Sequence, residues 1–381
     1  MDTTHEMVVA EVRRFVEREV MPVAHDLEQS DTYPVELIDK LKKLGVFAAT
    51  ISEAYGGLGL DFITYVQVVE ELARGWMSLC GIVNTHILVA YMIQAYGTED
   101  QRRRFLPAMA EGEKRGGICL SEANAGSDVQ AITMTALRDG DEYVLNGAKL
   151  WVTNGVHASI FAVLARTDTH ARPPHRGMSL FLVEKGTPGL SVGHTFDKLG
   201  YKGVETAELV FDHVRVPAVD LLGGREGEGF KHAMSGLEVG RINVAARAVG
   251  VAQAAFNDSI KYAQQRYTFG QPIAQHQAIQ LKLADMATKI EAARLLLQKA
   301  AAKKDGDERC DLEAGMAKLF ATEICQEVAL EAMRIHGGFG YTKEFNVERY
   351  YRDAPFMLVG EGTSEIQKLV IARQLLQRYR E

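Results

Sequence analysis

One acidic residue near the C-terminal end of the chain lies between two glycines, in the segment Gly360-Glu361-Gly362. Glycines allow a ligand to approach the backbone closely, and a carboxylate held beside such a ligand can act as a general base. The alternative is a solvated loop acid, because most glutamates are simply exposed. Ser364 and Gln367 follow with the spacing of a capping box and predict the start of an apolar helix over Ile366–Leu376.

Two segments in the middle of the chain could hold a polar or planar ligand. The first runs Leu120-Ser121-Glu122-Ala123-Asn124-Ala125-Gly126-Ser127-Asp128, where backbone amides and hydroxyls could bind a ring edge or a phosphate. The second runs Trp151-Val152-Thr153-Asn154-Gly155, where an aromatic ring and a hydroxyl could contact a planar cofactor. The alternatives are a surface turn for the first segment and a core tryptophan for the second.

Two arginines could bind an anion. Arg241 lies on an apolar helical stripe, and a guanidinium there needs a partner, either Glu238 three residues earlier or a polar ligand. Arg266 ends a long helix within Gln265-Arg266-Tyr267-Thr268-Phe269-Gly270, ahead of Gln277. It could clamp a phosphate, or it could be a solvated cation that the helix dipole favours.

A glycine-rich segment follows a helix at Arg334-Ile335-His336-Gly337-Gly338-Phe339-Gly340-Tyr341. Gly337 is expected to stop the helix, and Gly338 leaves the backbone bare for close approach to a phosphate. His336 could be a catalytic imidazole or a helix-end residue hydrogen-bonded to the backbone.

The elements that must position these residues change in type twice along the chain. Residues 1–117 have helical periodicity, with Gly45 expected to stop one helix and Thr98 with Gln101 expected to cap another. Residues 118–224 have strand periodicity, and Asn146-Gly147 predicts a hairpin.

Residues 225–381 are helical again. Asp311 is expected to cap one of their helices. A bundle seam is predicted there by the spacing of Ile279, Leu283, Met286, Ile290, Ala293 and Leu297. The pattern predicts an α+β multidomain protein, with an N-terminal α-helical domain, a middle antiparallel β-barrel-like domain and a C-terminal four-helix bundle.

Composition narrows the class of protein. The 381 residues are 47% hydrophobic and 24% charged, which is ordinary for a folded protein, and the net charge is −7. The Arg102–Arg104 triplet is flanked by acids and indicates a solvated helix face rather than a nucleic-acid surface. The four cysteines lack metal-ligand spacing, so we expect a reducing compartment and no metal. We also expect no membrane span, signal peptide or transit peptide, which predicts a cytoplasmic protein.

Taken together, these segments resemble the acyl-CoA dehydrogenase family of flavoproteins over essentially the whole chain. Leu120–Asp128 resembles the first signature of the family, and Gln265–Gly270 with Gln277 resembles the second. Further matches are Trp151–Gly155, His336–Tyr341, Arg349-Tyr350-Tyr351-Arg352-Asp353-Ala354 and Glu361-Gly362-Thr363. Each match is modest alone, but six in the right order are highly specific.

The resemblance implies FAD bound between the β domain and the bundle. On the flavin side it implies contacts from Leu120, Ser121, Gly126, Ser127, Trp151, Thr153, Thr363 and Glu365. Residues expected to reach the FAD of a neighbouring subunit are Arg266, Phe269, Gln277, Arg334, Ile335, His336, Gly337 and Gly338. The family is usually a tetramer built as a dimer of dimers, so a homo-oligomer is expected.

The resemblance also implies an acyl-CoA substrate, with Glu361 as the base that takes the α-proton while the β-hydride passes to the flavin. Some relatives place the base immediately before the arginine matched by Arg241, but that position is Gly240 here, which selects Glu361. Candidate substrate contacts are Ser127, Glu238, Arg241, Gly360 and Gly362. An electron-transferring flavoprotein is the expected electron acceptor.

Departures from the family pattern bear on the substrate. Gly360 stands where straight-chain enzymes often carry Tyr, so we expect open space beside it that admits branched or cyclic acyl groups. The function expected overall is the dehydrogenation of a short to medium acyl group. Arg334 replaces the common Gln and adds a positive charge near the expected pyrophosphate. Glutaryl-CoA dehydrogenases hold a distal carboxylate with an arginine, and Leu79–Ile87 contains none, so a dicarboxylate is not expected.

Two other classes of function remain open on this scaffold. One is an oxidase or monooxygenase that passes electrons to oxygen, although acyl-CoA oxidases are usually longer and the monooxygenase relatives usually lack the Glu before Gly-Thr. The other is a non-catalytic acyl-CoA-binding assembly subunit, which loss of the base or of the cofactor loops would mark. Neither is lost here.

Overall fold

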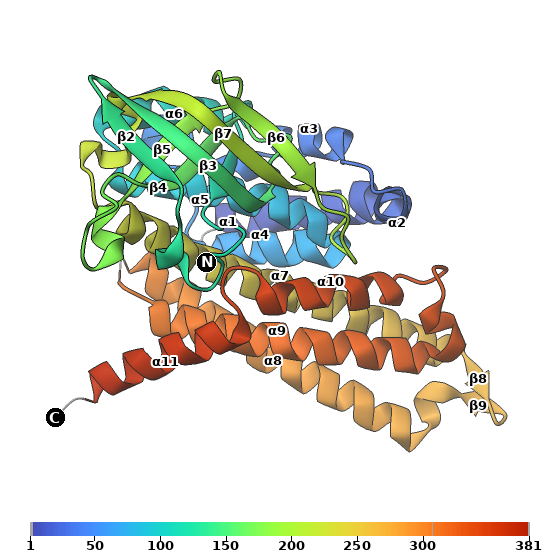
Figure 1. Ribbon diagram of the computed structural model, residues 1–381. Coiled ribbons are helices and arrows are strands. Elements are labelled where there is room, and N and C mark those ends of the chain that lie inside the picture. The colour runs from blue at the N-terminus through green and yellow to red at the C-terminus, as the bar shows by residue number, and fades with distance from the viewer. Residues whose placement is uncertain (1–2, 307, 380–381) are drawn as a thin grey trace.

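The structure is a computed structural model that describes residues 3–306 and 308–379. Figure 1 shows a β domain on one side of the molecule, a bundle of long helices on the other, and the N-terminal helices packed against both. The N-terminal helices are α1 (Thr3–Phe15), α2 (Met21–Gln29), α3 (Val35–Lys43), α4 (Phe62–Gly75), α5 (Met77–Tyr96) and α6 (Glu99–Ala110).

Two predicted signals in this region are confirmed. Gly45, just beyond α3, has a positive φ of 71° and ends that helix. Thr98 and Gln101 form a reciprocal capping box at the start of α6.

Helix α5 is the centre of the fold. It is the one helix among the described residues that is long and apolar enough to cross a membrane by length and composition. However, 89% of its apolar window is buried inside the protein, as expected for a core helix. It packs against α4, α6, α7 and β1, and it therefore joins the helical and β parts of the molecule.

The β domain is a single curled sheet. Its strands are β1 (Gly116–Cys119), β2 (Thr135–Asp139), β3 (Glu142–Thr153), β4 (Ile160–Arg166), β5 (Met178–Glu184), β6 (Leu190–Thr195) and β7 (Thr206–Pro217). They are ordered β1-β4-β2-β3-β7-β6, with β5 also paired to β4. Most pairs are antiparallel as predicted, but β4 runs parallel to β1 and to the start of β2.

The predicted hairpin at Asn146-Gly147 is wrong, because β3 continues through both residues. The pairing of β3 with β7 has an irregularity between Leu145 and Gly147, where Asn146 Oδ1 accepts from the His213 amide. Asn146 of β3 lies opposite two residues of β7, Asp212 and His213, so the extra residue belongs to β7 and forms a bulge. The chain instead reverses at Gly140, which has a φ of 66° between β2 and β3.

The bundle consists of α7 (Gly229–Gln265), α8 (Gln277–Asp305), α9 (Asp311–His336) and α10 (Val347–Val359). The predicted seam is buried at Met286, Ile290, Ala293 and Leu297. A small hairpin of β8 (Tyr267–Thr268) and β9 (Gln271–Pro272) lies at one end, and α11 (Ser364–Arg378) projects from the other (Figure 1). The predicted cap of α9 is wrong: the N-cap is Cys310, and Asp311 is the first helical residue.

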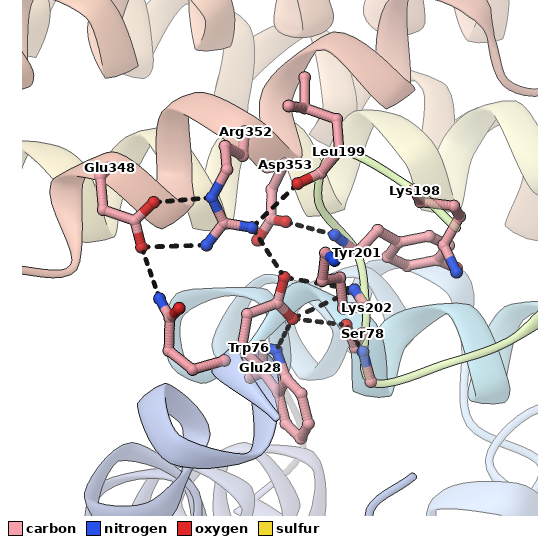
Figure 2. Close-up of polar contacts among 12 residues, drawn as sticks. Glu28, Trp76, Ser78, Lys198, Leu199, Tyr201, Lys202, Glu348, Arg352 and Asp353 are labelled. Atoms are coloured by element: carbon pink, nitrogen blue, oxygen red, sulfur yellow. Dashed lines mark hydrogen bonds and ion pairs between the residues drawn. The ribbon is translucent and has the colours of Figure 1, made fainter. Parts of the chain in front are cut away.

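A buried polar network fixes the β6–β7 loop against the helices (Figure 2). Glu28 on α2 is fully buried and accepts from Trp76 Nε1 at 2.8 Å and from the Lys202 amide at 3.2 Å. Arg352 on α10 reaches Glu28 at 3.3 Å, and its neighbour Asp353 accepts from the Tyr201 amide at 2.6 Å. The network therefore sets the position of Tyr201, whose side chain points into the interior.

Candidate active site

Glu361 lies on the short loop between α10 and α11, in a left-handed conformation with a φ of 54°. Such a backbone is uncommon outside glycine, and it persists only where the surroundings hold it. Lys318 on α9 donates to Gly362 O at 2.8 Å and to Leu358 O at 3.3 Å. Gln367 donates to Glu361 O at 3.2 Å and to Gly362 O at 3.1 Å. These two side chains, from α9 and α11, therefore clamp the loop.

The predicted capping box at Ser364 is wrong. The N-cap is Thr363, whose hydroxyl accepts from the Ile366 amide at 3.3 Å, and Ser364 is the first helical residue. The reason is that Gln367 does not turn back to an amide, but binds the loop carbonyls instead. Gln367, which we expected to complete the capping box, therefore supports the backbone of Glu361 instead.

The Glu361 carboxylate is surrounded by three helices. Its Oε1 accepts from Asn84 Nδ2 on α5 at 2.5 Å and lies 3.8 Å from Arg247 Nη2 on α7. Its Oε2 is buried and has no hydrogen-bond partner in the described part of the chain. Burial raises the pKa of Glu361, while Arg247, Asn84 and Lys318 oppose that rise. Burial therefore outweighs these opposing contacts, and the pKa of Glu361 lies above its ordinary value.

Arg247 is a buried cation beside this acid. Its side chain is 2% exposed, its Nε donates to Asn243 Oδ1 at 2.6 Å, and its Nη1 donates to the Tyr201 hydroxyl at 3.3 Å. Asn243 in turn donates to the Tyr65 hydroxyl at 2.7 Å. The Tyr201 hydroxyl lies so close to Gly81 on α5 that a Cβ there would be 1.5 Å away.

Helix α5 also joins Glu361 to the β domain. Asn84 contacts the carboxylate, and the next residue, Thr85, accepts from the Ile118 amide on β1 at 3.2 Å. Residues Leu120–Asp128 follow β1 directly. Leu120 is buried, and its carbonyl accepts from the buried Lys149 ammonium at 3.0 Å. The Ser121 carbonyl accepts from the Leu150 amide at 2.9 Å, so this segment and the end of β3 lie side by side.

Trp151 lies next to that junction and is not a core tryptophan. Its side chain is 58% exposed, it has a φ of 63°, and it stacks on Phe196 with ring centroids 4.3 Å apart. Thr153 ends the same strand and is half-buried, while Gly126 and Ser127 are exposed. A Cβ on Gly126 would meet nothing within 4 Å. The exposed ring and open backbone suit a planar ligand, and a surface turn alone would not need them.

A second set of predicted residues lies at the end of the bundle that carries β8 and β9, away from α11 (Figure 1). There a cavity of about 510 Å³ is lined by Tyr262, Arg266, Thr268, Ile273, Ile335, His336, Gly337, Gly338, Phe339 and Thr342. Gly337, with a φ of 61°, ends α9 as predicted, and no atom lies within 4 Å of a Cβ built on it or on Gly338. Trp151 is not among the residues that line this cavity.

The remaining residues of this second set differ in their surroundings. His336 Nδ1 lies 2.8 Å from Ala332 O, which is the helix-end role that we considered for it. Phe269 is 97% exposed, and Gln277 is exposed at the start of α8. Arg334 does not line the cavity, but pairs with Glu331 on its own helix.

Arg241 is buried as its stripe predicted, and of the two partners that we considered, Glu238 is not the one it contacts. Arg241 Nη1 lies 3.4 Å from Asp311 Oδ1, and its Nε has no partner among the described residues. Glu238 instead accepts from Lys304 on α8 at 2.9 Å. The spacing of Glu238 and Arg241 allows an ion pair within α7. However, α8 packs against α7 and places Lys304 next to Glu238, so Glu238 pairs with Lys304 instead.

Gly360 lies beside an aromatic side chain. A Cβ on Gly360 would be 3.1 Å from Phe356 Cζ, and Phe356 stacks on Tyr201 with centroids 4.5 Å apart. The space that we expected to be open beside Gly360 is therefore bounded by Phe356.

Sequence reasoning missed three residues around Glu361, namely Asn84, Arg247 and Lys318, and assigned the fourth, Gln367, to a helix cap. Two of them left a signal. Asn84-Thr85-His86 is a polar triplet inside an apolar helix, and Arg247 is a lone charge within Val244–Val251, which is otherwise Val, Ala and Gly. Polar groups in such surroundings need partners. Lys318 left no comparable pattern.

Comparison with known proteins finds the same family that the sequence segments resemble, over nearly the whole chain. Three family models match: acyl-CoA dehydrogenase, N-terminal domain, over residues 2–113; middle domain, over 117–214; and C-terminal domain, over 227–376. An acyl-CoA dehydrogenase of Bacillus subtilis (strain 168) is 42% identical over 99% of both chains.

Solved structures are equally similar. The butyryl-CoA dehydrogenase of Megasphaera elsdenii has a TM-score of 0.96 and 40% identity over 99% of both chains. A chain from the structural study of the electron transferring flavoprotein of Acidaminococcus fermentans has a TM-score of 0.96 and 39% identity, again over 99% of both chains.

Proposed function

Because this chain belongs to the acyl-CoA dehydrogenase family, we propose that Glu361 is the base in the α,β-dehydrogenation of an acyl-CoA thioester to the trans-2-enoyl-CoA. The protein is an FAD-dependent oxidoreductase of that family. The observation that carries the assignment of the base is the buried Oε2 of Glu361, which has no hydrogen-bond partner in residues 3–306 and 308–379. A base must keep one oxygen free for the proton that it takes.

The backbone of Glu361 is the second element of the proposal. Its amide has no acceptor within the described residues, and Lys318 and Gln367 hold the adjoining carbonyls. An amide fixed in this way can donate to the thioester oxygen and stabilise the enolate-like charge that forms when the α-proton leaves. We propose Ser127, Glu238, Arg241, Gly360 and Gly362 as further substrate contacts.

FAD, when bound, supplies the acceptor for the β-hydride. We propose that Leu120, Ser121, Gly126, Ser127, Trp151, Thr153, Thr363 and Glu365 hold it near the base. The second contact set would come from a neighbouring subunit: Arg266, Phe269, Gln277 and Arg334, Ile335, His336, Gly337 and Gly338. Support comes from the exposed Trp151 ring and from the separate cavity at the far end of the bundle. This arrangement requires an oligomer, and we propose a homotetramer.

The wider assignments are also proposals. We propose a short to medium acyl group, a role in β-oxidation in the cytoplasm, and an electron-transferring flavoprotein as electron acceptor. The last is supported by the Acidaminococcus fermentans relative. We propose domain boundaries that give 1–117, 118–224 and 225–381, on the change from helical to strand periodicity and back.

The test is an anaerobic panel of acyl-CoA thioesters, followed through bleaching of the flavin absorbance. Wild type is expected to bleach with at least one thioester, and Glu361→Gln is expected to retain FAD and bind the thioester without bleaching. Glu291→Gln, an exposed change on α8, is the matched control. Bleaching by Glu361→Gln at the wild-type rate would overturn the assignment of the base. Rapid reoxidation of the reduced flavin in air would favour an oxidase.

A further inference from the structure

Arg247 has an unusual charge balance for a buried cation. It lies at 2% exposure within a run of Val, Ala and Gly, so water does not solvate it. Its hydrogen bonds go to neutral acceptors, the Asn243 amide and the Tyr201 hydroxyl. Burial raises the pKa of Tyr201 to about 12 and keeps this hydroxyl neutral. Within the described residues, Glu361 is the only carboxylate that forms an ion pair with Arg247.

The ion pair between Arg247 and Glu361 is longer than a hydrogen bond. Nη2 of Arg247 lies 3.8 Å from Glu361 Oε1, which is beyond hydrogen-bond length, and it donates no hydrogen bond to any other described residue. A guanidinium normally binds carboxylate through two parallel short bonds. One edge of the guanidinium therefore lies beside the acid with its donor capacity unused.

The reaction removes even this partner. When Glu361 takes the α-proton, its carboxylate becomes neutral, and Arg247 remains charged because guanidinium does not give up its proton in proteins. A buried cation that loses its counter-charge is strongly destabilised. With an uncharged acyl chain this cost would fall on the step that the enzyme has to accelerate.

We propose that the acyl group of the substrate carries a carboxylate of its own, and that Arg247 binds it. This rests on the proposed function of Glu361. The substrate class is a short dicarboxylic monothioester, such as succinyl-CoA or glutaryl-CoA. The chain must be short because Arg247 and the base that meets the α-carbon are neighbours. The second carboxylate would give Arg247 an anion that persists through proton transfer.

This reverses the expectation drawn from Leu79–Ile87. The absence of an arginine there describes α5 alone, whereas Arg247 comes from α7 and reaches the same carboxylate as Asn84 of α5.

The experiment compares matched thioesters on the FAD-loaded enzyme. Anaerobic kcat/KM is measured for succinyl-CoA and glutaryl-CoA against butyryl-CoA and pentanoyl-CoA, which replace the carboxylate by methyl. Wild type is expected to prefer the dicarboxylates by about 100-fold or more, because a buried charge-assisted pair carries the difference. A wild type that prefers the neutral thioesters would overturn the inference and leave the proposed function intact. If no thioester bleaches the flavin, the proposed function itself fails.

Two variants and a binding measurement test whether Arg247 binds the carboxylate of the substrate or only holds the side chain of Glu361 in place. Arg247→Gln is expected to remove the preference for carboxylate, and Arg247→Lys to keep part of it. Arg294→Gln, which breaks an ion pair with Glu70 on α4, is the control and leaves the preference unchanged. Affinities measured by calorimetry for the same thioesters in Glu361→Gln and in Glu361→Gln/Arg247→Gln report binding without turnover. If Arg247 serves only Glu361, both affinity and kcat/KM ratios stay the same when it is replaced, and the inference is wrong.

Discussion

The carboxylate of Glu361 occupies the space beside Gly240 that any side chain there would need. A Cβ built on Gly240 would lie 1.6 Å from Glu361 Oε2. Gly240 is the position where some relatives place their base, so the two alternatives compete for the same volume. The absence of a side chain at Gly240 is therefore a requirement for the observed position of the Glu361 carboxylate, which we propose as the base.

Gly240→Ala is expected to displace the carboxylate from Asn84 and slow flavin reduction by about 10- to 100-fold, because small misplacement of a base is costly. Stopped-flow absorbance measures the rate. Gly236→Ala, one turn earlier, is the control, since its Cβ would meet the flexible end of Met92 at 3.0 Å. Equal rates in both variants would contradict the idea that Gly240 sets the position of Glu361.

The acid limb of the pH–rate profile should report Glu361. Burial raises its pKa, and the hydrogen bond from Asn84 opposes that rise. The base works when deprotonated, so the rate falls as pH drops through this pKa. Asn84→Ala removes the opposing bond, and the limb is expected to move to higher pH by about one unit. An unmoved limb, measured on flavin reduction, would show that another group controls it.

Lys318 should act through the loop and not through the substrate. Lys318→Met keeps the length of the side chain but removes the donors to Gly362 O and Leu358 O. We expect the rate of flavin reduction to fall about 10-fold, with thioester affinity changing less, because the left-handed Glu361 backbone loses its support. Lys299→Met, on the surface of α8, is the control. A loss confined to affinity would argue for a substrate contact instead.

Asp353 should make stability depend on pH. Burial, with the nearby Glu28 charge, raises its pKa to about 7, although Arg349 and Arg352 oppose this. The folded state therefore holds a proton that the unfolded chain releases near pH 4, so this contribution to stability is lost as pH rises from about 4 to 7. Asp353→Asn still accepts from the Tyr201 amide and is expected to flatten that dependence. Urea unfolding at pH 4.5, 6 and 7.5 measures it, and parallel curves for both proteins would refute it.

Trp151 should contribute to cofactor retention. The ring is 58% exposed in the protein alone, so its removal opens no core cavity. Trp151→Ala is expected to weaken FAD binding about 10-fold through lost aromatic contact, measured as flavin retained on dialysis. Val219→Ala, another exposed apolar residue at 70%, is the control. Full retention of flavin by Trp151→Ala would remove Trp151 from the proposed site.

Phe269 should report the subunit contact. An aromatic ring that is 97% exposed is expected to be covered in an oligomer. Phe269→Asp should shift sedimentation toward smaller species and lower FAD content, whereas Val35→Asp on α3 should do neither. A tetramer with full flavin in Phe269→Asp would contradict the proposed interface.

Much of the fold could be predicted from the sequence. The order of helices, sheet and helices follows from local periodicity, and Gly45, Thr98 and Gly337 end or begin helices where backbone chemistry requires it. The errors were also local. Asn146-Gly147 suits a hairpin or a bulge, and only pairing with β7 decides between them.

The sequence by itself determined the family segments, their order and the glycine-flanked position of Glu361, because these depend on neighbouring residues. Only the tertiary structure decided what surrounds that carboxylate. Asn84, Arg247 and Lys318 come from α5, α7 and α9, which the packing of the helices brings to one point. Contacts between such distant segments depend on the relative placement of whole helices, and no local pattern in the chain encodes that placement.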